Sequence, residues 1–326
     1  MHDQFQRQIN YLRISVTDRC NLRCVYCMPD GGVKSVPHEE VLTIEEIVEV
    51  VAAGVPLGIR KVRLTGGEPL VRRGIIKLVQ KLHQIPEIDD IALTTNGILL
   101  EKMAGGLKEA GVNRVNISLD TLKPARYRKI TRGGNLDQVW RGINAALDKN
   151  LQPVKINTVA IRGFNDDELV DLARLTIGQP LHVRFIELMP IGTSDNWAGG
   201  KYIPTSEVQE LITGALGNLT EEKLVTGSGP AYYGRLPGGR GTVGFISAVS
   251  NHFCARCNRL RLTATGQLRP CLFSSQEIDI KQALRSGAGR EELTRIFREA
   301  ILNKPDQHDL AARWQDDDRV MSQIGG

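Results

Sequence analysis

The sequence predicts an α/β fold, an incomplete, open (β/α)6 TIM-like barrel. Six short apolar or β-branched runs alternate along the chain with amphipathic segments of helical period. Strands that alternate with helices of this length form parallel sheets with right-handed crossovers. Six such units are too many for a small doubly wound sheet and too few for a closed eightfold barrel. The length of 326 residues exceeds one ordinary domain, so we also expect an appended region.

Each predicted element has its own local signal. Thr43 and Glu46 have the spacing of a capping box, which marks the start of the first helix. The predicted strands are Tyr11–Val16, Lys61–Thr65, Asp90–Thr94, Arg114–Ser118, Val154–Val159 and His182–Ile186. The predicted helices are Thr43–Ala53, Gly74–Gln84, Leu100–Ala110, Leu136–Lys149 and Asp166–Thr176, followed by Ser206–Leu216, Glu277–Arg285 and Glu291–Asn303.

The predicted strands carry polar residues on one face. A barrel interior that is merely packed is filled with Val, Ile and Leu. A solvated face is the alternative, but parallel strands are usually covered on both sides. The pattern therefore predicts a polar lumen, lined with cations, that holds an anionic ligand. The polar positions are Lys61, Arg63, Asn116, Ser118, Lys155, Asn157 and Arg184, and the apolar positions opposite are Val62, Leu64, Val115, Ile117, Val154 and Ile156.

Composition excludes several classes of protein. With 41% hydrophobic and 24% charged residues, wholesale disorder is excluded. The nearly apolar stretch Val50–Ile59 is too short and too interrupted for a transmembrane helix. The start MHDQFQRQIN lacks the apolar core of a signal peptide, which predicts a cytoplasmic protein. A net charge of +5 is a weak signal for nucleic acid, so we expect neither nucleic acid nor a membrane as partner.

The first of two cysteine triads follows the first predicted strand. Cys20, Cys24 and Cys27 have the spacing C-x3-C-x2-C, in a loop at the end of the barrel where active sites lie. Three thiolates do not complete a structural zinc site, which takes four protein ligands. On a four-iron cluster, three thiolates leave one iron open to another ligand. A chance spacing or a zinc knuckle is the alternative interpretation.

The second triad consists of Cys254, Cys257 and Cys271. By spacing alone, a zinc site that also uses His252 competes with an iron–sulfur cluster. Arg259 and Arg261 follow directly, and their alternation places both guanidinium groups on one side of an extended segment. Two such groups can hold a phosphate chain through paired hydrogen bonds, as lysine cannot.

The motifs in order resemble those of the radical S-adenosylmethionine (SAM) enzymes. The resemblance is carried by CxxxCxxC, by Tyr26 within it, and by Gly66-Gly67-Glu68-Pro69 at the end of the second strand. It implies a [4Fe–4S] cluster on Cys20, Cys24 and Cys27. It also implies that S-adenosyl-L-methionine binds this cluster, in a pocket lined by Tyr26, Gly67, Ser118 and Met189.

Further motifs resemble the branch of these enzymes that acts on GTP in molybdenum cofactor biosynthesis. They are YLRIS, TDRCNLRCVYCMP, RLTGGEP, LTTNG, NISLD, KINTV, RFIELMP, CNRLR and the terminal Gly-Gly. This resemblance implies a second [4Fe–4S] cluster on Cys254, Cys257 and Cys271, in a C-terminal extension that caps the barrel. The resulting division is 1–190 for the barrel core and 191–326 for the C-terminal region.

The same resemblance implies a substrate and a reaction. A 5′-deoxyadenosyl radical would abstract H-3′ of GTP, and C3′ would bond to C8, giving (8S)-3′,8-cyclo-7,8-dihydroguanosine 5′-triphosphate. The resemblance assigns catalytic roles to Arg13, Arg261, Gly325 and Gly326. It assigns GTP binding to Arg13, Arg63, Thr94, Lys155, Arg259, Leu260 and Arg261, to which strand alternation adds Lys61 and Arg184.

The resemblance implies an external one-electron donor, a downstream cyclic pyranopterin monophosphate synthase and a homodimer. For Gly325-Gly326, a disordered tail and a carrier-type adenylation site are alternatives to a tail in the active site. The rival functions are a twin-cluster radical enzyme that modifies a peptide, and a zinc-stabilised protein that binds nucleic acid.

Overall fold

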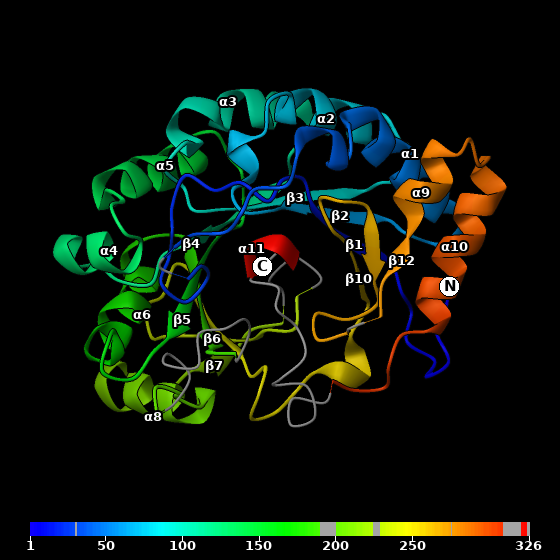
Figure 1. Ribbon diagram of the computed structural model, residues 1–326. Coiled ribbons are helices and arrows are strands. Elements are labelled where there is room, and N and C mark those ends of the chain that lie inside the picture. The colour runs from blue at the N-terminus through cyan, green and yellow to red at the C-terminus, as the bar shows by residue number, and fades with distance from the viewer. Residues whose placement is uncertain (30, 190–199, 224–228, 275, 309–320, 325–326) are drawn as a thin grey trace.

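The computed structural model describes residues 1–326 except 30, 190–199, 224–228, 275, 309–320 and 325–326. Its strands form one 12-stranded sheet, which curves into an open arc with helices on the outside (Figure 1). In the described residues the two edge strands, β12 and β7, do not pair with each other, so the barrel is incomplete, as predicted. The sheet order is β12-β11-β10-β1-β2-β3-β4-β5-β6-β9-β8-β7.

The six predicted strands form the centre of this sheet and are parallel. Their bounds match the predictions to within one residue at each end. They are β1 (Tyr11–Ser15), β2 (Lys61–Thr65), β3 (Asp90–Thr95), β4 (Arg114–Ser118), β5 (Val154–Ala160) and β6 (Leu181–Glu187).

The C-terminal region extends the sheet at both edges, which sequence analysis did not foresee. Strand β9 (Thr242–Ile246) lies parallel to β6, and β10 (Arg259–Leu262) lies parallel to β1. The region therefore does more than cap the barrel, because it supplies two of its parallel strands. Antiparallel partners complete each edge: β7 (Thr220–Glu221), β8 (Tyr232–Arg235), β11 (Gln267–Arg269) and β12 (Ile278–Asp279).

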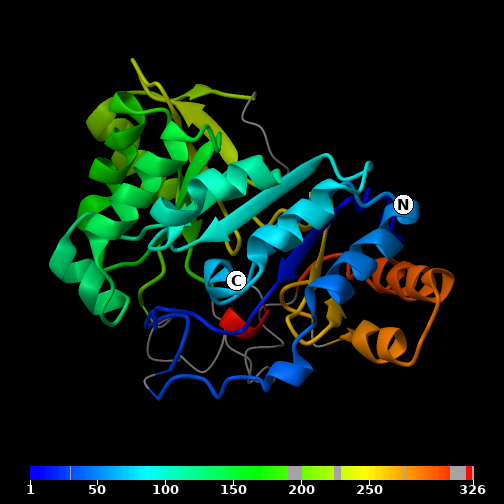
Figure 2. The ribbon, with the colours of Figure 1, turned by 90° about the horizontal axis from the view of Figure 1, so that it is seen from above.

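Helices cover the outer face of the sheet. Seen from above, α9 and α10 lie beside α1 at one end of the arc and α8 lies beside α6 at the other (Figure 2). The capping box of α1 forms as predicted, with Thr43 Oγ1 accepting from Glu46 N at 3.1 Å. The helices are α1 (Ile44–Gly54), α2 (Ile75–His83), α3 (Leu100–Ala110), α4 (Pro124–Ile130), α5 (Leu136–Asp148), α6 (Leu169–Gly178), α8 (Thr205–Leu216), α9 (Ile280–Arg285), α10 (Arg290–Leu302) and α11 (Met321–Ile324).

Two predicted helix starts differ from the structure, and one helix was not predicted. The segment Asp166–Glu168 is a 3-10 turn, and α6 begins only at Leu169. Near Glu277, the chain first forms β12, and Asp279 then caps α9 by accepting from Gln282 N at 2.8 Å. Helix α4 was not predicted, and its seven residues are too few to show a clear period.

The last described helix lies inside the barrel. Helix α11 sits within the curve of the sheet in Figure 1, and its Ile324 is buried. The Arg261 guanidinium donates to the Ile324 carbonyl oxygen at 3.5 Å. The chain thus returns to the lumen just before its final two residues, which lie outside the described part. Within that part, the helices are also too short or too polar for a membrane span.

Two helical glycines give a stability prediction. A Cβ at Gly142 in α5 would lie 2.3 Å from the Gly97 carbonyl oxygen, whereas one at Gly105 in α3 would meet only Lys149 Cε, at 3.9 Å. We expect Gly142→Ala to destabilise the protein by about 1–3 kcal/mol, because backbone cannot move aside cheaply. Gly105→Ala should stabilise it by about 0.5–1 kcal/mol through helix propensity. Thermal unfolding midpoints of the two variants check this, and a midpoint for Gly142→Ala at or above that of the parent contradicts it.

Candidate functional site

The inner face of the parallel strands is lined with basic residues, as the alternation predicted. Strand register places Arg261, Arg13 and Arg63 side by side on β10, β1 and β2. The next pairs bring Asn116 beside Lys155 on β4 and β5, and Asn157 beside Arg184 on β5 and β6. Residues of the opposite parity, including Val62, Leu64, Val115, Ile117, Val154 and Ile156, are fully buried in the hydrophobic core.

Positive charge on this face exceeds negative charge. Its basic residues on the parallel strands are Arg13, Lys61, Arg63, Arg114, Lys155, Arg184, Arg259 and Arg261. Among the described residues of the same face and strands, the acidic one is Asp90, which forms an ion pair with Arg114. This pair, which no sequence motif marks, lies where β3 and β4 begin.

The excess charge lowers the pKa values of its members. Burial lowers the pKa of Arg13 well below its usual range, and the neighbouring Arg261 and Arg63 lower it further. Burial and Arg259 lower the pKa of Arg261 to about 9. Burial and the charges of Arg184, Arg114 and Arg63 lower the pKa of Lys155 to about 6. Such a cluster is costly until an anion neutralises it, so the lumen is suited to a polyanionic ligand.

Polar atoms on this face also lack partners. Thr94 Oγ1, Arg63 Nε and Arg184 Nε are buried and form no hydrogen bond with the described residues. The Arg184 guanidinium is held by Asn116 Oδ1 at 2.7 Å and Asn157 Oδ1 at 2.5 Å. These amides fix the direction of Arg184 without neutralising its charge. The unsatisfied donors are consistent with a ligand in the lumen.

The predicted GTP-binding residue Leu260 differs from its neighbours. Its side chain is fully buried in the hydrophobic core, on the face of β10 opposite to Arg259 and Arg261. Alternation in a strand requires this arrangement. Leu260 can therefore approach a ligand in the lumen only through its main chain.

The first triad lies at the carboxyl ends of the parallel strands. The Cys24 carbonyl oxygen accepts from Cys27 N and Met28 N, both at 2.9 Å, which folds the triad into a tight turn. Cys20 Sγ accepts from Leu22 N at 3.4 Å. Burial and the nearby Cys27 raise the pKa of Cys24 well above its usual value. A buried thiolate there requires a positive partner, which the iron of a cluster provides.

The glycines after β2 allow two loops to meet. A Cβ at Gly67 would lie 2.4 Å from the Arg19 carbonyl oxygen, and one at Gly66 would lie 2.5 Å from that of Thr17. The loop after β2 therefore packs directly against the segment that leads to Cys20. This contact fits the predicted role of Gly67 beside a cluster-bound ligand, because a side chain would separate the two loops.

Two buried carboxylates, Glu68 and Asp120, connect loops at the rim of this site, and these roles were not predicted from the sequence. Glu68 accepts from Leu70 N, Thr95 Oγ1 and Asn96 N at 2.7–3.0 Å, which joins the loops after β2 and β3. Burial raises the pKa of Glu68 to about 7. No period or spacing marks such long-range contacts in a sequence.

The second carboxylate, Asp120, orients Tyr26. Tyr26 OH donates to Asp120 Oδ2 at 2.7 Å, and Val159 N donates to Asp120 Oδ1 at 2.8 Å. Asp120 comes two residues after Ser118, so the bond brings Tyr26 and Ser118 to the same rim. Met189 follows β6 at the carboxyl ends too and is half-buried. The predicted SAM pocket residues thus share one end of the barrel.

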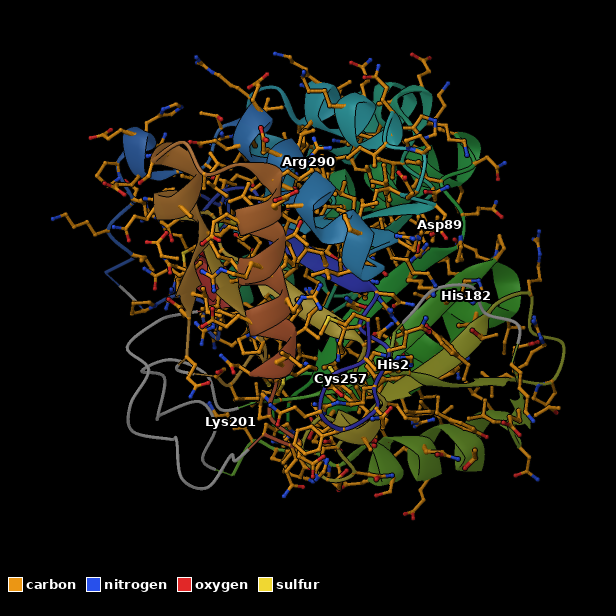
Figure 3. All side chains as sticks on the ribbon, turned by 90° about the vertical axis from the view of Figure 1, so that its right-hand side faces the viewer. His2, Asp89, His182, Lys201, Cys257 and Arg290 are labelled. Carbon is orange, nitrogen blue, oxygen red and sulfur yellow. The ribbon has the colours of Figure 1, made fainter. Side chains whose placement is uncertain are left out.

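The second triad lies at the opposite, amino ends of the strands. Cys257 precedes β10, and His182 marks the same end of β6 (Figure 3). Cys254 and Cys257 share a 3-10 turn, with Cys257 N donating to the Cys254 carbonyl oxygen at 3.0 Å. The antiparallel pairing of Arg261 with Arg269, continued by two residues, places Cys271 opposite Arg259. The three thiols therefore come from adjoining segments, as a shared cluster requires.

No site preformed for zinc is present among the described residues. Among the described residues, no group of three His, Cys, Asp or Glu side chains is close enough to hold a single ion. His252 is exposed and its ring packs edge-on against that of His308, with centroids 5.2 Å apart. A four-iron cluster binds each thiolate through a different iron, so it needs more widely separated thiols than zinc does.

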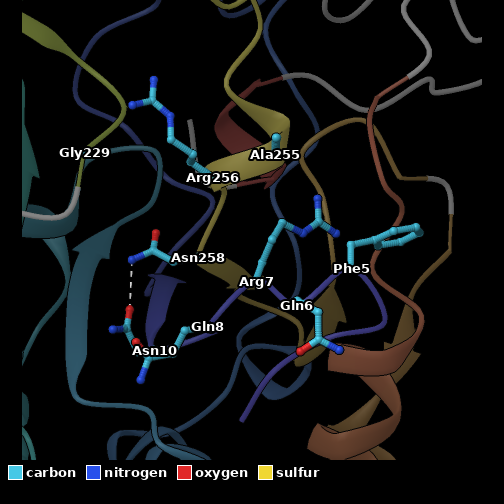
Figure 4. A pocket seen from close by; sticks show the side chains of 9 residues that line it. All are labelled: Phe5, Gln6, Arg7, Gln8, Asn10, Gly229, Ala255, Arg256 and Asn258. Atoms are coloured by element: carbon cyan, nitrogen blue, oxygen red, sulfur yellow. Dashed lines mark hydrogen bonds between the residues drawn. The ribbon is translucent and has the colours of Figure 1, made fainter.

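A pocket of about 390 Å³ borders the second triad. Its lining includes Ala255 and Arg256 from the cysteine turn and Asn10 and Asn258 from the starts of β1 and β10. The Asn258 side chain donates to Asn10 Oδ1 at 2.8 Å across this end of the barrel (Figure 4). The basic residues of the lumen thus lie between two candidate metal centres, the first triad at the carboxyl ends of the strands and the second triad at their amino ends.

An open parallel barrel with a CxxxCxxC loop at its carboxyl end defines a class of enzyme. The Radical SAM superfamily model matches residues 14–176, and that of Molybdenum Cofactor Synthesis C matches residues 181–310. The chain belongs to the radical SAM superfamily. A solved structure of SuiB from Streptococcus suis bound to S-adenosylmethionine shares the fold, with a TM-score of 0.59 at 14% identity. The alignment covers 84% of this chain and 64% of that one.

Full-length relatives define the branch of this superfamily. A protein named GTP 3′,8-cyclase from Pelotomaculum thermopropionicum is 61% identical over 326 residues, which is 100% of each chain. One of the same name from Desulforamulus reducens is 58% identical over 326 residues, again 100% of each chain. Within the superfamily, the chain belongs to the family of these GTP 3′,8-cyclases.

Proposed function

We propose that the lumen cations bind the triphosphate of GTP, with the first triad at one end of the substrate and the second triad at the other. The chain is a radical SAM enzyme that converts GTP in molybdenum cofactor biosynthesis, as its family membership supports. The observation that carries the assignment of GTP to the lumen is the buried cation cluster around Arg13. GTP brings close to four negative charges, which would neutralise the cluster.

The cofactors of this family are two [4Fe–4S] clusters and S-adenosyl-L-methionine. Cys20, Cys24 and Cys27 would hold one cluster, and Cys254, Cys257 and Cys271 the other. Bound to the first cluster, S-adenosylmethionine would supply the 5′-deoxyadenosyl radical chemistry that removes the hydrogen from C3′ of GTP. Tyr26, Gly67, Ser118 and Met189 would position this cofactor, since the structure brings them to the carboxyl end that carries the first triad.

The lumen residues then orient the substrate. Arg13, Arg63 and Arg261 are adjacent in register, so their guanidinium groups suit successive phosphates. The other proposed contacts come from Lys61, Thr94, Lys155, Arg184 and Arg259, and from the main chain of Leu260. Holding the ribose and the base in a fixed orientation favours the bond from C3′ to C8, because the two reacting atoms are already close together.

We propose catalytic roles for Arg13, Arg261 and the terminal Gly325-Gly326. The two glycines lie outside the described residues. Support comes from Ile324, which directly precedes them and whose carbonyl oxygen lies 3.5 Å from the Arg261 guanidinium. A tail that enters beside Arg261 would narrow the lumen and exclude water from a radical reaction.

Organisation and partners are also proposals. We place a boundary near residue 190, between a core at 1–190 and a C-terminal region at 191–326 that supplies the second triad. An external one-electron donor, a homodimer and transfer of product to a cyclic pyranopterin monophosphate synthase are consistent with the family. We propose a cytoplasmic location, supported by six cysteines that form no disulfide.

Isotope transfer tests the proposed function. Anaerobically reconstituted enzyme is incubated with S-adenosylmethionine, dithionite and GTP deuterated at C3′. We expect mass spectrometry to find deuterium in the 5′-deoxyadenosine, because the radical takes that hydrogen. Unlabelled 5′-deoxyadenosine, formed equally fast without GTP, would remove GTP as the substrate. Absence of 5′-deoxyadenosine from protein with full iron content would remove the radical reaction itself.

The depressed pKa of Lys155 gives a proton-linkage prediction. Its folded value of about 6 lies below its ordinary value, so the amine is mostly neutral at about pH 7.5 before substrate binds. Unfolded protein binds more protons than folded protein between these two values, so this group makes stability rise with pH across that window. A polyanion beside Lys155 raises the pKa of this amine again. We therefore expect the protein to take up close to one proton when GTP binds.

Calorimetry in buffers of different ionisation enthalpy measures this uptake directly. Lys155→Met should abolish most of it and weaken binding of GTP, whereas Lys149→Met, at an exposed position, should retain both. Equal uptake by Lys155→Met and the parent protein would show that another group titrates.

A further inference from the structure

A buried lysine joins the two segments that flank the second triad. Lys304 follows α10 and is only 3% exposed. Its ammonium donates to the Arg259 carbonyl oxygen at 2.9 Å and to the Pro270 carbonyl oxygen at 2.6 Å. Arg259 comes two residues after Cys257, and Pro270 directly precedes Cys271. One side chain therefore fixes the main chain beside two of the three cysteines.

Arg7 holds the main chain of the third cysteine. Its guanidinium donates to the Cys254 carbonyl oxygen at 2.9 Å, and to those of Asp306 at 2.7 Å and Pro305 at 2.7 Å. Arg7 points toward the turn that carries Ala255 in Figure 4. Because Pro305 and Asp306 directly follow Lys304, the two cations share one short segment, and together they tie all three cysteine segments to it.

The two cations differ in how their charge is balanced. Arg7 is paired with the buried Asp3, whose Oδ2 lies 2.6 Å from Arg7 Nε. Lys304 forms no ion pair within the part of the chain that the structure describes, and its two acceptors are neutral carbonyl oxygens. A buried ammonium held by neutral acceptors keeps its full electrostatic effect on nearby groups.

We propose that Lys304 is a positioning residue for the second cluster, and that its uncompensated charge stabilises the reduced form of that cluster. The proposal rests on the assignment of a [4Fe–4S] cluster to Cys254, Cys257 and Cys271. Net charge and hydrogen bonding around a cluster set its reduction potential, and a nearby cation favours the more negative, reduced state. Lys304 also fixes the start of β10, which carries Arg259 and Arg261 toward the substrate.

The test isolates the second cluster in the full-length chain. Cys20, Cys24 and Cys27 are replaced together by serine, so that about four irons per chain report on the second triad alone. In this background, Lys304→Met and Lys304→Arg are compared with Lys281→Met. Lys281 is a matched control, because it also bridges to a carbonyl oxygen, that of Glu40 at 3.2 Å, but lies on α9 away from the cysteines. The measurements are iron content, a potentiometric titration followed by electron paramagnetic resonance, and the melting temperature.

We expect Lys304→Met to shift the potential to more negative values and to alter the resonance spectrum. Lys304→Arg should keep a potential near that of the parent, and Lys281→Met should match the parent in both. Lys304→Met could instead lose its iron. In that case, a full iron content and the parental potential in Lys304→Arg support the proposal. Loss of iron from both Lys304 variants overturns it. An unchanged potential in Lys304→Met overturns it as well. If the triple serine variant with Lys304 intact binds no cluster, the cluster assignment and this proposal are both wrong. This outcome is distinct from a failure of the Lys304 variants alone.

Discussion

Replacing Arg261 with methionine is expected to lower kcat/KM for GTP by about 10²–10³-fold. Removing one partner of a buried, charge-assisted contact costs about 2–5 kcal/mol, and each 1.4 kcal/mol is a factor of ten. Arg261 is buried beside Arg13 in the lumen, and its guanidinium also contacts the Ile324 carbonyl oxygen. The substitution thus removes a phosphate contact and the support of the C-terminal segment at once. Steady-state kinetics under anaerobic conditions measure the loss.

The reductive cleavage of S-adenosylmethionine separates this effect from general damage. Arg261 on β10 pairs in register with Arg13 in the middle of β1, whereas the first triad lies beyond the carboxyl end of β1. We therefore expect Arg261→Met to keep formation of 5′-deoxyadenosine with dithionite while losing the cyclised nucleotide. Arg141→Met removes one exposed arginine, paired with Glu101 at 2.9 Å, and should behave as the parent. Cyclised nucleotide formed at the parental rate, or 5′-deoxyadenosine lost to the same extent as the cyclised nucleotide, would contradict the assignment.

Local signals accounted for most of the fold. The strands β1–β6 have the predicted bounds because each combines a period of two with flanking turn residues. The alternation that assigned Lys155 and Arg184 to a polar face depends only on strand geometry. The structure therefore shows the same polar face. The capping box at Thr43 is equally local. These features need no information about distant segments.

Long-range pairing accounts for what the sequence did not reveal. Strand β9 pairs with β6 across more than fifty residues, and β10 pairs with β1 across more than two hundred. Both are short and contain residues that suit many environments, so no periodicity marks them as part of the barrel. The same reason explains why Lys304 was passed over. A lone lysine after a helix is usually exposed, and only its contacts with Arg259 and Pro270 show otherwise.

The site itself was predicted from motifs rather than from geometry. Spacing grouped the cysteines, but it left zinc and iron open for the second triad, and membership of the GTP 3′,8-cyclase family decides for iron. The roles of Glu68 and Asp120 are a further case, because each joins loops that are distant in the chain. A carboxylate that accepts hydrogen bonds from another loop looks like any other acidic residue in a sequence.

Replacing Cys24 with serine is expected to abolish cleavage of S-adenosylmethionine. The turn should persist, because its hydrogen bonds from Cys27 N and Met28 N end on the Cys24 carbonyl oxygen and not on its thiol. Serine is a poor ligand for iron, so the first cluster should be lost and iron should fall from about eight to about four per chain. Formation of 5′-deoxyadenosine should drop to background, a loss of at least about 10³-fold.

The reciprocal substitution makes this prediction specific to one end of the barrel. Cys271→Ser should also reduce iron to about four per chain, since the second triad would be broken. It should nevertheless keep cleavage of S-adenosylmethionine, because the first triad lies at the carboxyl ends of the strands and Cys271 follows β11 at the other end. Only turnover of GTP should fail. Equal loss of 5′-deoxyadenosine in both variants would mean that the two triads do not act as separate centres, since a cluster at each end predicts opposite results for the two substitutions.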